Sequence, residues 1–139
     1  MNDAILFEQI VDVYHEFSKK IDSNITRNVV RLVLTKAAKQ KRIVIIDEES
    51  GPPSFGVARA FNNMNAAILP GFHEEDGSIV YVDFVYTSNK ESMTLIMDAL
   101  FNRFHNVKQI AFHRKAKSNK QLRVYPINQF NRLTKLIGD

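Results

Sequence analysis

Apolar residues recur every three or four positions along the first part of the chain, a spacing typical of helices with one buried face. One such stretch covers residues 3–19, and a second runs from about Thr26 to Lys39. Because a side-chain oxygen in front of a helix accepts hydrogen bonds from first-turn amides, Asn24 or Thr26 is expected to cap the second helix. The chain is therefore predicted to open with two amphipathic helices.

The pattern then changes to short, β-branched apolar runs. Residues 42–47 (RIVIID) form one run and residues 54–61 (SFGVARAF) another, with a glycine and two prolines between them. Two such runs around strong turn residues predict a β-hairpin. The next segment, 62–77, contains one proline and two glycines. It is longer than most connections, which predicts a loop, with room for one turn of helix, that has a functional or lid-like role.

The best-defined unit of the chain is a strand, a helix and a second strand joined by short turns. Residues 78–86 and 107–113 are the strands, and residues 89–104 are a helix with its apolar side chains on one face. Such a unit predicts a parallel crossover. Residues 121–125 are expected to form a last strand, and residues 126–137 a C-terminal helix with Pro126 in its first turn.

Length and composition are those of one ordinary globular domain. The chain has 139 residues, of which 45% are hydrophobic and 24% charged, so a single domain over residues 1–139 is expected. The absence of cysteine excludes disulfides and thiolate metal sites. No apolar run approaches the roughly 18 residues of a membrane span, and the N-terminus lacks the basic start of a signal peptide. A cytoplasmic protein without a membrane partner is expected.

Basic residues are concentrated in the C-terminal part of the chain. Residues 103–139 carry nine Lys or Arg and one acidic residue, whereas the rest of the chain is net acidic. A basic end on an acidic body is typical of proteins that bind a polyanion, such as nucleic acid, a phosphorylated cofactor or an acidic protein. A solvated basic face without any partner gives the same pattern. The candidate polyanion-binding residues are Arg114, Lys115, Lys117, Lys120 and Arg123.

The order of these elements (two helices, a hairpin, then strand, helix and strand) resembles that of the GNAT superfamily of acyl-CoA N-acyltransferases. The resemblance implies an α+β fold with a GNAT-like mixed sheet, a β-hairpin, a β-α-β crossover and flanking helices. It also implies acyl-CoA as the cofactor, bound against a splayed pair of central strands, here 78–86 and 107–113. A typical member begins with a strand, whereas this chain begins with a helix.

GNAT enzymes carry a glycine-rich phosphate loop after the central strand, and this chain has no glycine there. The corresponding stretch, residues 85–93, reads VYTSNKESM. The start of the following helix can still attract an anion. Alternatively, residues 87–89 simply cap that helix. The candidate cofactor-binding residues are Val85, Thr87, Ser88, Asn89 and Lys90.

One GNAT branch without that loop is similar to the chain at this point. In the toxin-activating lysine acyltransferases, and in small phage-encoded relatives of GNAT proteins, a strand with a central aspartate leads through a short polar turn into the helix. Residues 81–89 (YVDFVYTSN) resemble that strand and turn, which puts Asp83 at the position of the branch's important aspartate. In the toxin-activating enzymes a histidine ahead of the helix before the hairpin partners the aspartate, but the matching residues 20–26 contain none.

Asp83 is the candidate catalytic residue. It lies between apolar residues in the strand 78–86, and regular alternation would put it on one face with Ile79, Tyr81 and Val85. Burial raises the pKa of a carboxyl group, which suits a general base that deprotonates an attacking amine. The alternative is a structural carboxylate that accepts backbone N–H bonds or pairs with Arg59 or Arg114 across the sheet.

Other site types lack support in the sequence. The four histidines show no spacing that pairs ligands, so no metal site is predicted. The nucleophile, P-loop and dinucleotide-binding motifs are also missing. Two functions stay open. One is a phage-encoded, non-catalytic GNAT-like protein that acts as a virion component or binds protein or nucleic acid. The other is a divergent acyl-CoA-dependent N-acyltransferase.

Overall fold

A five-stranded mixed sheet forms the centre of the molecule. The computed structural model describes residues 3–69, 71–115 and 120–126, with the backbone alone for 113–115 and 120–126. The strands lie side by side in chain order, and the pairing of β3 with β4 is parallel while the other pairs are antiparallel. The strands are β1 (Ile43–Ile46), β2 (Ser54–Phe61), β3 (Ile79–Tyr86), β4 (Gln109–Lys115) and β5 (Lys120–Pro126).

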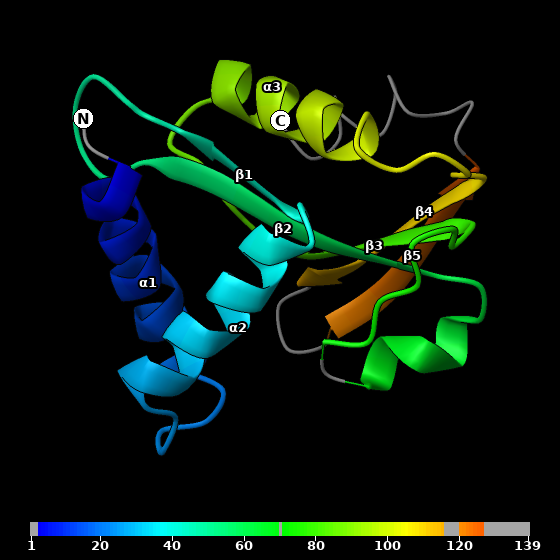
Figure 1. Ribbon diagram of the computed structural model, residues 1–139, viewed down its shortest axis with the longest axis horizontal. Helices are drawn as coiled ribbons and strands as arrows, with labels where there is room; N and C mark the ends of the chain where they lie inside the picture. Colours follow the sequence, from blue (N-terminus) through cyan, green and yellow to red (C-terminus); the bar gives the residue numbers. More distant parts are fainter. Residues whose placement is uncertain (1–2, 70, 116–119, 127–139) are drawn as a thin grey trace.

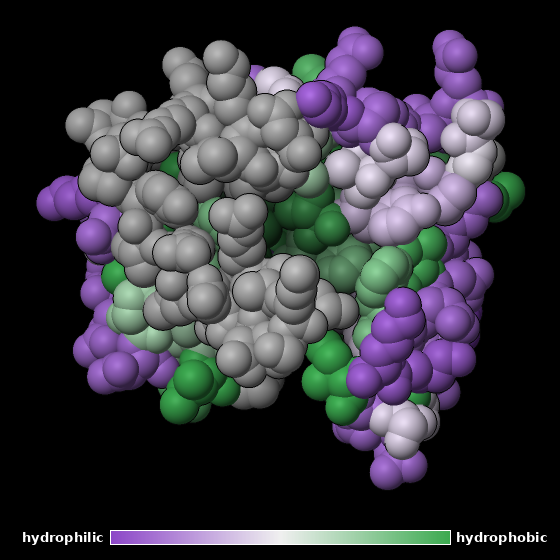
Figure 2. All heavy atoms as spheres, turned by 180° about the vertical axis from the view of Figure 1, so that it is seen from behind, coloured by the Kyte–Doolittle hydropathy of each residue, from purple (hydrophilic) through white to green (hydrophobic). Residues whose placement is uncertain are grey.

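Helices cover both faces of this sheet (Figure 1). Helix α3 (Lys90–Phe101) lies on one face, and α1 (Asp3–Lys19) and α2 (Arg27–Lys39) lie on the other. A short 3-10 helix, η1 (Met64–Ile68), follows β2. Every residue of β2 is buried because apolar side chains press on the strand from both sides. Seen from behind, hydrophobic side chains gather in a hollow near the centre of the molecule, and hydrophilic ones lie towards its edges (Figure 2).

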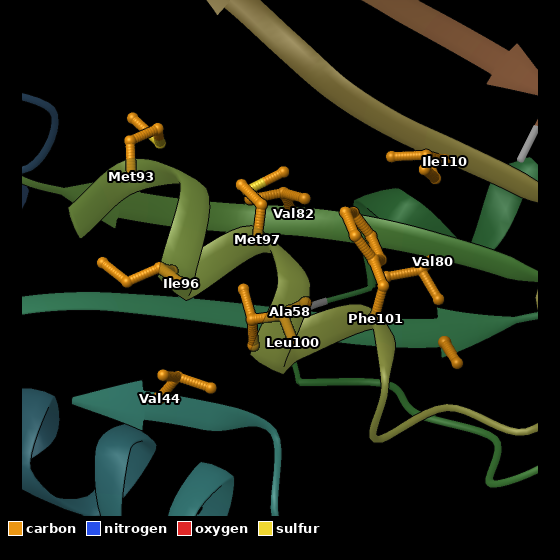
Figure 3. Packing of buried hydrophobic residues seen from close by; sticks show 11 residues of the cluster. Val44, Ala58, Val80, Val82, Met93, Ile96, Met97, Leu100, Phe101 and Ile110 are labelled. Carbon is orange, nitrogen blue, oxygen red and sulfur yellow. The ribbon is translucent and has the colours of Figure 1, made fainter. Parts of the chain in front are cut away.

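The core under α3 explains why that helix crosses the sheet where it does. Ile96, Met97 and Leu100 are fully buried and pack on Val80 and Val82 of β3, as Figure 3 shows. Residue 56 in β2 is glycine, and a Cβ atom there would lie 2.6 Å from the Cγ2 atom of Ile96. The helix therefore approaches the sheet directly over that glycine.

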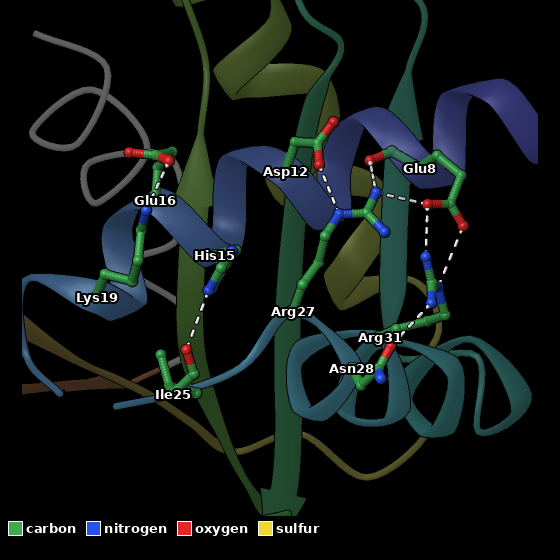
Figure 4. Close-up of polar contacts among 9 residues, drawn as sticks. All are labelled: Glu8, Asp12, His15, Glu16, Lys19, Ile25, Arg27, Asn28 and Arg31. Carbon is green, nitrogen blue, oxygen red and sulfur yellow. Dashed lines mark hydrogen bonds and ion pairs between the residues drawn. The ribbon is translucent and has the colours of Figure 1, made fainter. Parts of the chain in front are cut away.

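The α1–α2 pair is held together by polar contacts as well as by its apolar faces (Figure 4). Glu8 accepts hydrogen bonds from both Arg27 and Arg31, and Arg27 also donates to Asp12 at 2.8 Å. His15 contacts the carbonyl of Ile25 at 3.0 Å across the connection between the helices. These bonds join α1 to α2 and to the connection between them.

The predicted α+β class is confirmed, and at the level of element order the sheet is GNAT-like, with a hairpin, a parallel crossover and flanking helices. The helix predicted over 89–104 ends earlier, at Phe101, although Phe104 still packs on the same core. Among the residues expected to cap the helices, Thr26 caps α2 and Asn89 caps α3. The predicted helix over 126–137 lies outside the described residues.

Two irregularities break the sheet near its centre. Val57 pairs with Phe84 but Ala58 pairs with Val82, so one residue of β3, Asp83, is inserted as a β-bulge. The parallel pairing of β3 with β4 covers Ile79–Val82 and stops there, although both strands continue. Beyond that point β3 stays with β2 and β4 stays with β5, so the two strands part.

Candidate functional site

Asp83 forms an ion pair with Arg59 across β2 and β3. Both oxygens of the carboxylate accept from Nε of Arg59, at 2.9 and 3.0 Å, and Nη2 of Arg59 lies 2.9 Å from Oδ1. The two side chains are 6% and 19% exposed. Arg59, one of the two arginines that the sequence suggested as partners, is thus paired with Asp83, and the side chain of Arg114 lies outside the described part of the structure.

The bulge changes which residues of β3 lie on the same face of the sheet as Asp83. Asp83 and Phe84 follow one another on the side of α1 and α2, where Asp83 lines a cavity and Phe84 contacts Tyr14. Val85 then packs with the α3 core. The expectation that Asp83 and Val85 share a face is wrong, because the extra residue shifts the alternation by one position.

Arg59 also anchors the long connection after β2. Its Nη1 donates to the carbonyl of Leu69 at 2.7 Å and to that of Phe72 at 3.4 Å, and Nη2 donates to the carbonyl of Ala67 at 3.1 Å. Every nitrogen of the guanidinium therefore has an acceptor. The guanidinium also lies 5.4 Å from the ring centre of Tyr81. Arg59 thus ties the segment that was predicted to act as a lid to the sheet through three of its backbone carbonyls.

The electrostatics of Asp83 reflect its burial. Desolvation raises the pKa of its carboxyl group above the ordinary value, and the hydrogen bonds and charge of Arg59 oppose that shift. A raised pKa is what a general base needs. However, the carboxylate oxygens that would accept a substrate proton already accept from Arg59.

β1 does not extend along the whole of β2, and the rest of that edge of β2 forms hydrogen bonds with the connection after β2. The N–H of Ala60 donates to Nδ1 of His73 at 3.0 Å, and the carbonyl of Ala60 accepts from the N–H of Glu74 at 2.8 Å. Burial, together with the nearby charge of Arg42, lowers the pKa of His73. His73 is therefore a neutral acceptor that holds the connection against the strand.

The start of α3, where a phosphate was expected, is occupied by a carboxylate of this chain. Ser92 and the amide of Asn89 both donate to Glu48, at distances of 2.8 to 3.0 Å. Asn89 also caps the helix by accepting from the N–H of Ser92 at 2.7 Å, and the N–H of Asn89 donates to the hydroxyl of Thr87 at 3.3 Å. A helix N-terminus attracts anions, and here Glu48 is that anion.

The other predicted cofactor residues lie around this point. Ser88 is exposed in the turn, and Lys90 is the first residue of α3. Val85 contributes its side chain to the core and not to the turn. The structure thus brings Thr87, Ser88, Asn89 and Lys90 together, and the contacts it gives to Thr87 and Asn89 are those of a helix cap.

A cavity of about 550 Å³ opens beside Asp83, between α2 and the connection that Arg59 anchors. Its walls are mostly apolar, and its floor is formed by Asp83, Arg59 and Arg42. Tyr14 of α1 also lines the cavity, and burial raises the pKa of its hydroxyl group. No pattern in the sequence indicates this site, because its residues come from separate helices, strands and connections of the chain.

The basic candidates fall in the hairpin that parts from β3. Arg114 and Lys115 are positions of β4, and Lys120 and Arg123 are positions of β5. In the strand register Lys115 is opposite Lys120, and Phe112 is opposite Arg123. Lys117 lies outside the described residues. The backbone therefore collects four of the five basic positions in one hairpin.

Neither a metal centre nor a membrane span emerges from the residues described. No group of three or more potential metal ligands is found among them. No helix among them has both the length and the apolar character needed to cross a membrane.

When the chain was compared with known proteins, no family model, no curated protein and no solved structure matched it.

Proposed function

We propose that this protein is a non-catalytic binding module on a GNAT-like sheet, and that it recognises a polyanionic partner through its basic C-terminal positions. The observation that carries the proposal is that both acyltransferase elements are occupied: Arg59 holds Asp83, and Glu48 lies at the start of α3. A general base needs a carboxylate that can take a proton. A pyrophosphate needs a helix start that does not already face a negative charge.

Calorimetry with acetyl-CoA and with longer acyl-CoA thioesters tests the non-catalytic part. The native protein is expected to bind neither at millimolar ligand, because the carboxylate of Glu48 repels the pyrophosphate. The variant Glu48→Ala removes this carboxylate. Glu49→Ala is its matched control, since Glu49 is an exposed acid in the same turn. Binding of acyl-CoA by the native protein at micromolar concentration would overturn the proposal.

The polyanion part is tested by reversing charges. The variant Lys115→Glu, Lys117→Glu, Lys120→Glu is compared with Lys19→Glu, Lys20→Glu, Lys39→Glu. The second variant changes the net charge equally, at exposed positions at the ends of α1 and α2. The probes are a short DNA duplex, a DNA single strand and polyglutamate. Only the C-terminal reversals should abolish binding, and the affinity of the native protein should fall steeply with salt. Equal loss in both variants would mean that net charge alone acts.

The identity of the partner follows from which probe binds. DNA binding with no response to polyglutamate indicates nucleic acid, and the reverse indicates an acidic protein. On the resemblance to small phage-encoded relatives of GNAT proteins, we propose a virion component or a phage-encoded binder of host protein or nucleic acid. In that setting the basic hairpin supplies the contact and the helices on the sheet supply the scaffold.

A divergent N-acyltransferase is the second candidate, and the parting of β3 and β4 beyond Val82 favours it. In GNAT proteins acyl-CoA lies against strands that splay in this way. The variant Glu48→Ala separates the two candidates, because it frees the start of α3 while leaving Asp83 and Arg59 untouched. If Glu48→Ala binds acyl-CoA and the native protein does not, Glu48 blocks a site that the fold otherwise retains.

A further inference from the structure

Arg42 is a buried cation that forms no ion pair with the described residues. Its side chain leaves the residue only 3% exposed. Nε donates to the amide oxygen of Gln40 at 2.6 Å, and Nη1 donates to the carbonyl of Ala58 at 3.1 Å. Throughout residues 3–69, 71–115 and 120–126, no carboxylate lies within ion-pair distance of it, and Nη2 has no hydrogen bond. Burying an unpaired charge is costly, so such a group calls for an anion.

The two described acids that line the cavity, Asp22 and Asp83, do not pair with Arg42. Asp83 is already bound to Arg59 at 2.9 Å. The other acid that lines the cavity, Asp22, is exposed. Burial lowers the pKa of the Arg42 guanidinium, and Asp83 opposes the shift only through its charge. An arginine keeps its proton in proteins, so two cations, Arg42 and Arg59, line the cavity beside Asp83.

The apolar walls of the cavity favour a ligand whose remaining part, beyond its anionic group, is apolar. Ile21, Ile25 and Val33 line it, and the apolar part of its surface is much the larger. At the entrance, Nζ of Lys36 contacts the carbonyl of Gly71 at 3.5 Å, which bridges α2 and the connection after β2. A volume of about 550 Å³ lies in the range of small-molecule sites.

We propose that this cavity binds a medium-chain fatty acid, with the carboxylate on Arg42 and the alkyl chain along the apolar wall of α2. An arginine binds a carboxylate through two parallel N–H bonds, and at Arg42, which lines the cavity, Nη2 and the second hydrogen of Nη1 have no acceptor among the described residues. The alkyl chain then replaces water at apolar side chains. The site is independent of the basic hairpin, so it extends the proposed function and does not rest on it.

Two valines of α2 give a matched pair of variants. Val33 lines the cavity and is 44% exposed, whereas Val29 does not line it and is 45% exposed. Titration calorimetry with decanoate should show binding to the native protein and to Val29→Trp. Val33→Trp should bind at least about tenfold more weakly, because the indole fills the cavity. Equal affinities of the two variants, or no binding of decanoate by the native protein at millimolar concentration, would overturn the proposal.

The role of Arg42 is tested with decanol, which has the same chain without the charge. The native protein should prefer decanoate over decanol by about tenfold or more. Arg42→Met should lose that preference while it still binds decanol. A preserved preference contradicts the assignment of the carboxylate to Arg42. If Arg42→Met fails to fold, the comparison of Val33→Trp with Val29→Trp decides the proposal alone. The triple charge reversal in the basic hairpin should bind decanoate like the native protein, which separates this site from the proposed function.

Discussion

Asp83 is the inserted residue of a β-bulge, and Arg59 on the neighbouring strand meets it with two hydrogen bonds of 2.9 and 3.0 Å. Asp83 shares the face of Tyr81, which pairs with Arg59, and the bulge places the next residue, Phe84, on this face as well. Arg59 in turn binds three carbonyls of the connection after β2. One ion pair thus joins two strands and a long loop, and it does so at the residue that the resemblance marks as chemically important.

Breaking this pair on one side should be strongly destabilising. Asp83→Ala and Arg59→Met are each expected to lower the free energy of unfolding by about 3 kcal/mol, because each leaves a buried group of the other without its partner. The double variant should lose clearly less than the sum. Chemical denaturation of the four proteins measures this. The exposed pair Asp12 and Arg27 is the control, where coupling should stay below about 1 kcal/mol. Additive losses at Asp83 and Arg59 would show that the pair is not coupled.

Gly77 is required by the close approach of the chain to β2. A Cβ atom there would lie 2.3 Å from the backbone nitrogen of Phe61, which cannot move aside like a flexible side chain. Gly77→Ala is therefore expected to lower the free energy of unfolding by about 1–3 kcal/mol. Gly51→Asn is the control, since Gly51 has open space around it and a positive φ that Asn tolerates. A Gly77→Ala variant as stable as the native protein would be evidence against this close approach.

His73 should make stability depend on pH near neutrality. Burial lowers its pKa below the usual 6.5, so the unfolded chain takes up a proton at a higher pH than the folded protein does. Its contribution is therefore present above pH 6.5 and is lost as the pH falls below that value. His73→Asn keeps an acceptor for the N–H of Ala60 but cannot be protonated. Thermal unfolding between pH 7.5 and 5.5 should show a loss for the native protein that is smaller in this variant. Parallel curves would exclude His73 as the cause.

Glu8 should make stability depend on pH in the acid range. Hydrogen bonds from Arg31 and Arg27 lower its pKa from 4.5 to about 2. Its contribution is therefore present above pH 4.5 and is lost as the pH falls towards 2. Glu8→Gln should be less stable than the native protein at pH 6, with the difference vanishing at acid pH. Glu16→Gln, which removes an exposed pair with Lys19, should show a smaller difference at every pH. A difference for Glu8→Gln that persists at pH 2 would assign its effect to packing.

The candidate site was only partly accessible from the sequence. Asp83 was recognised as a buried carboxylate, and Arg59 was one of two partners that strand pairing allowed. The role of Glu48 at the start of α3 had no sequence signal, because Glu48 and Ser92 are 44 positions apart. For Arg42 the sequence predicts only the first position of the strand 42–47. It follows Lys41 directly in front of an apolar run, and this pattern does not distinguish a buried arginine from an exposed one.

The sequence by itself determined the elements and their order. Helical spacing placed α1 at residues 3–19, and alternating turn and apolar runs placed β2 at residues 54–61, both as observed. These features depend on neighbours within a few positions, so local chemistry is sufficient to predict them. Only the tertiary structure decided the bulge at Asp83, the parting of β3 from β4 and the cavity above Arg42. Each of these depends on how segments far apart in the chain meet, and on which charges find a partner when water is excluded.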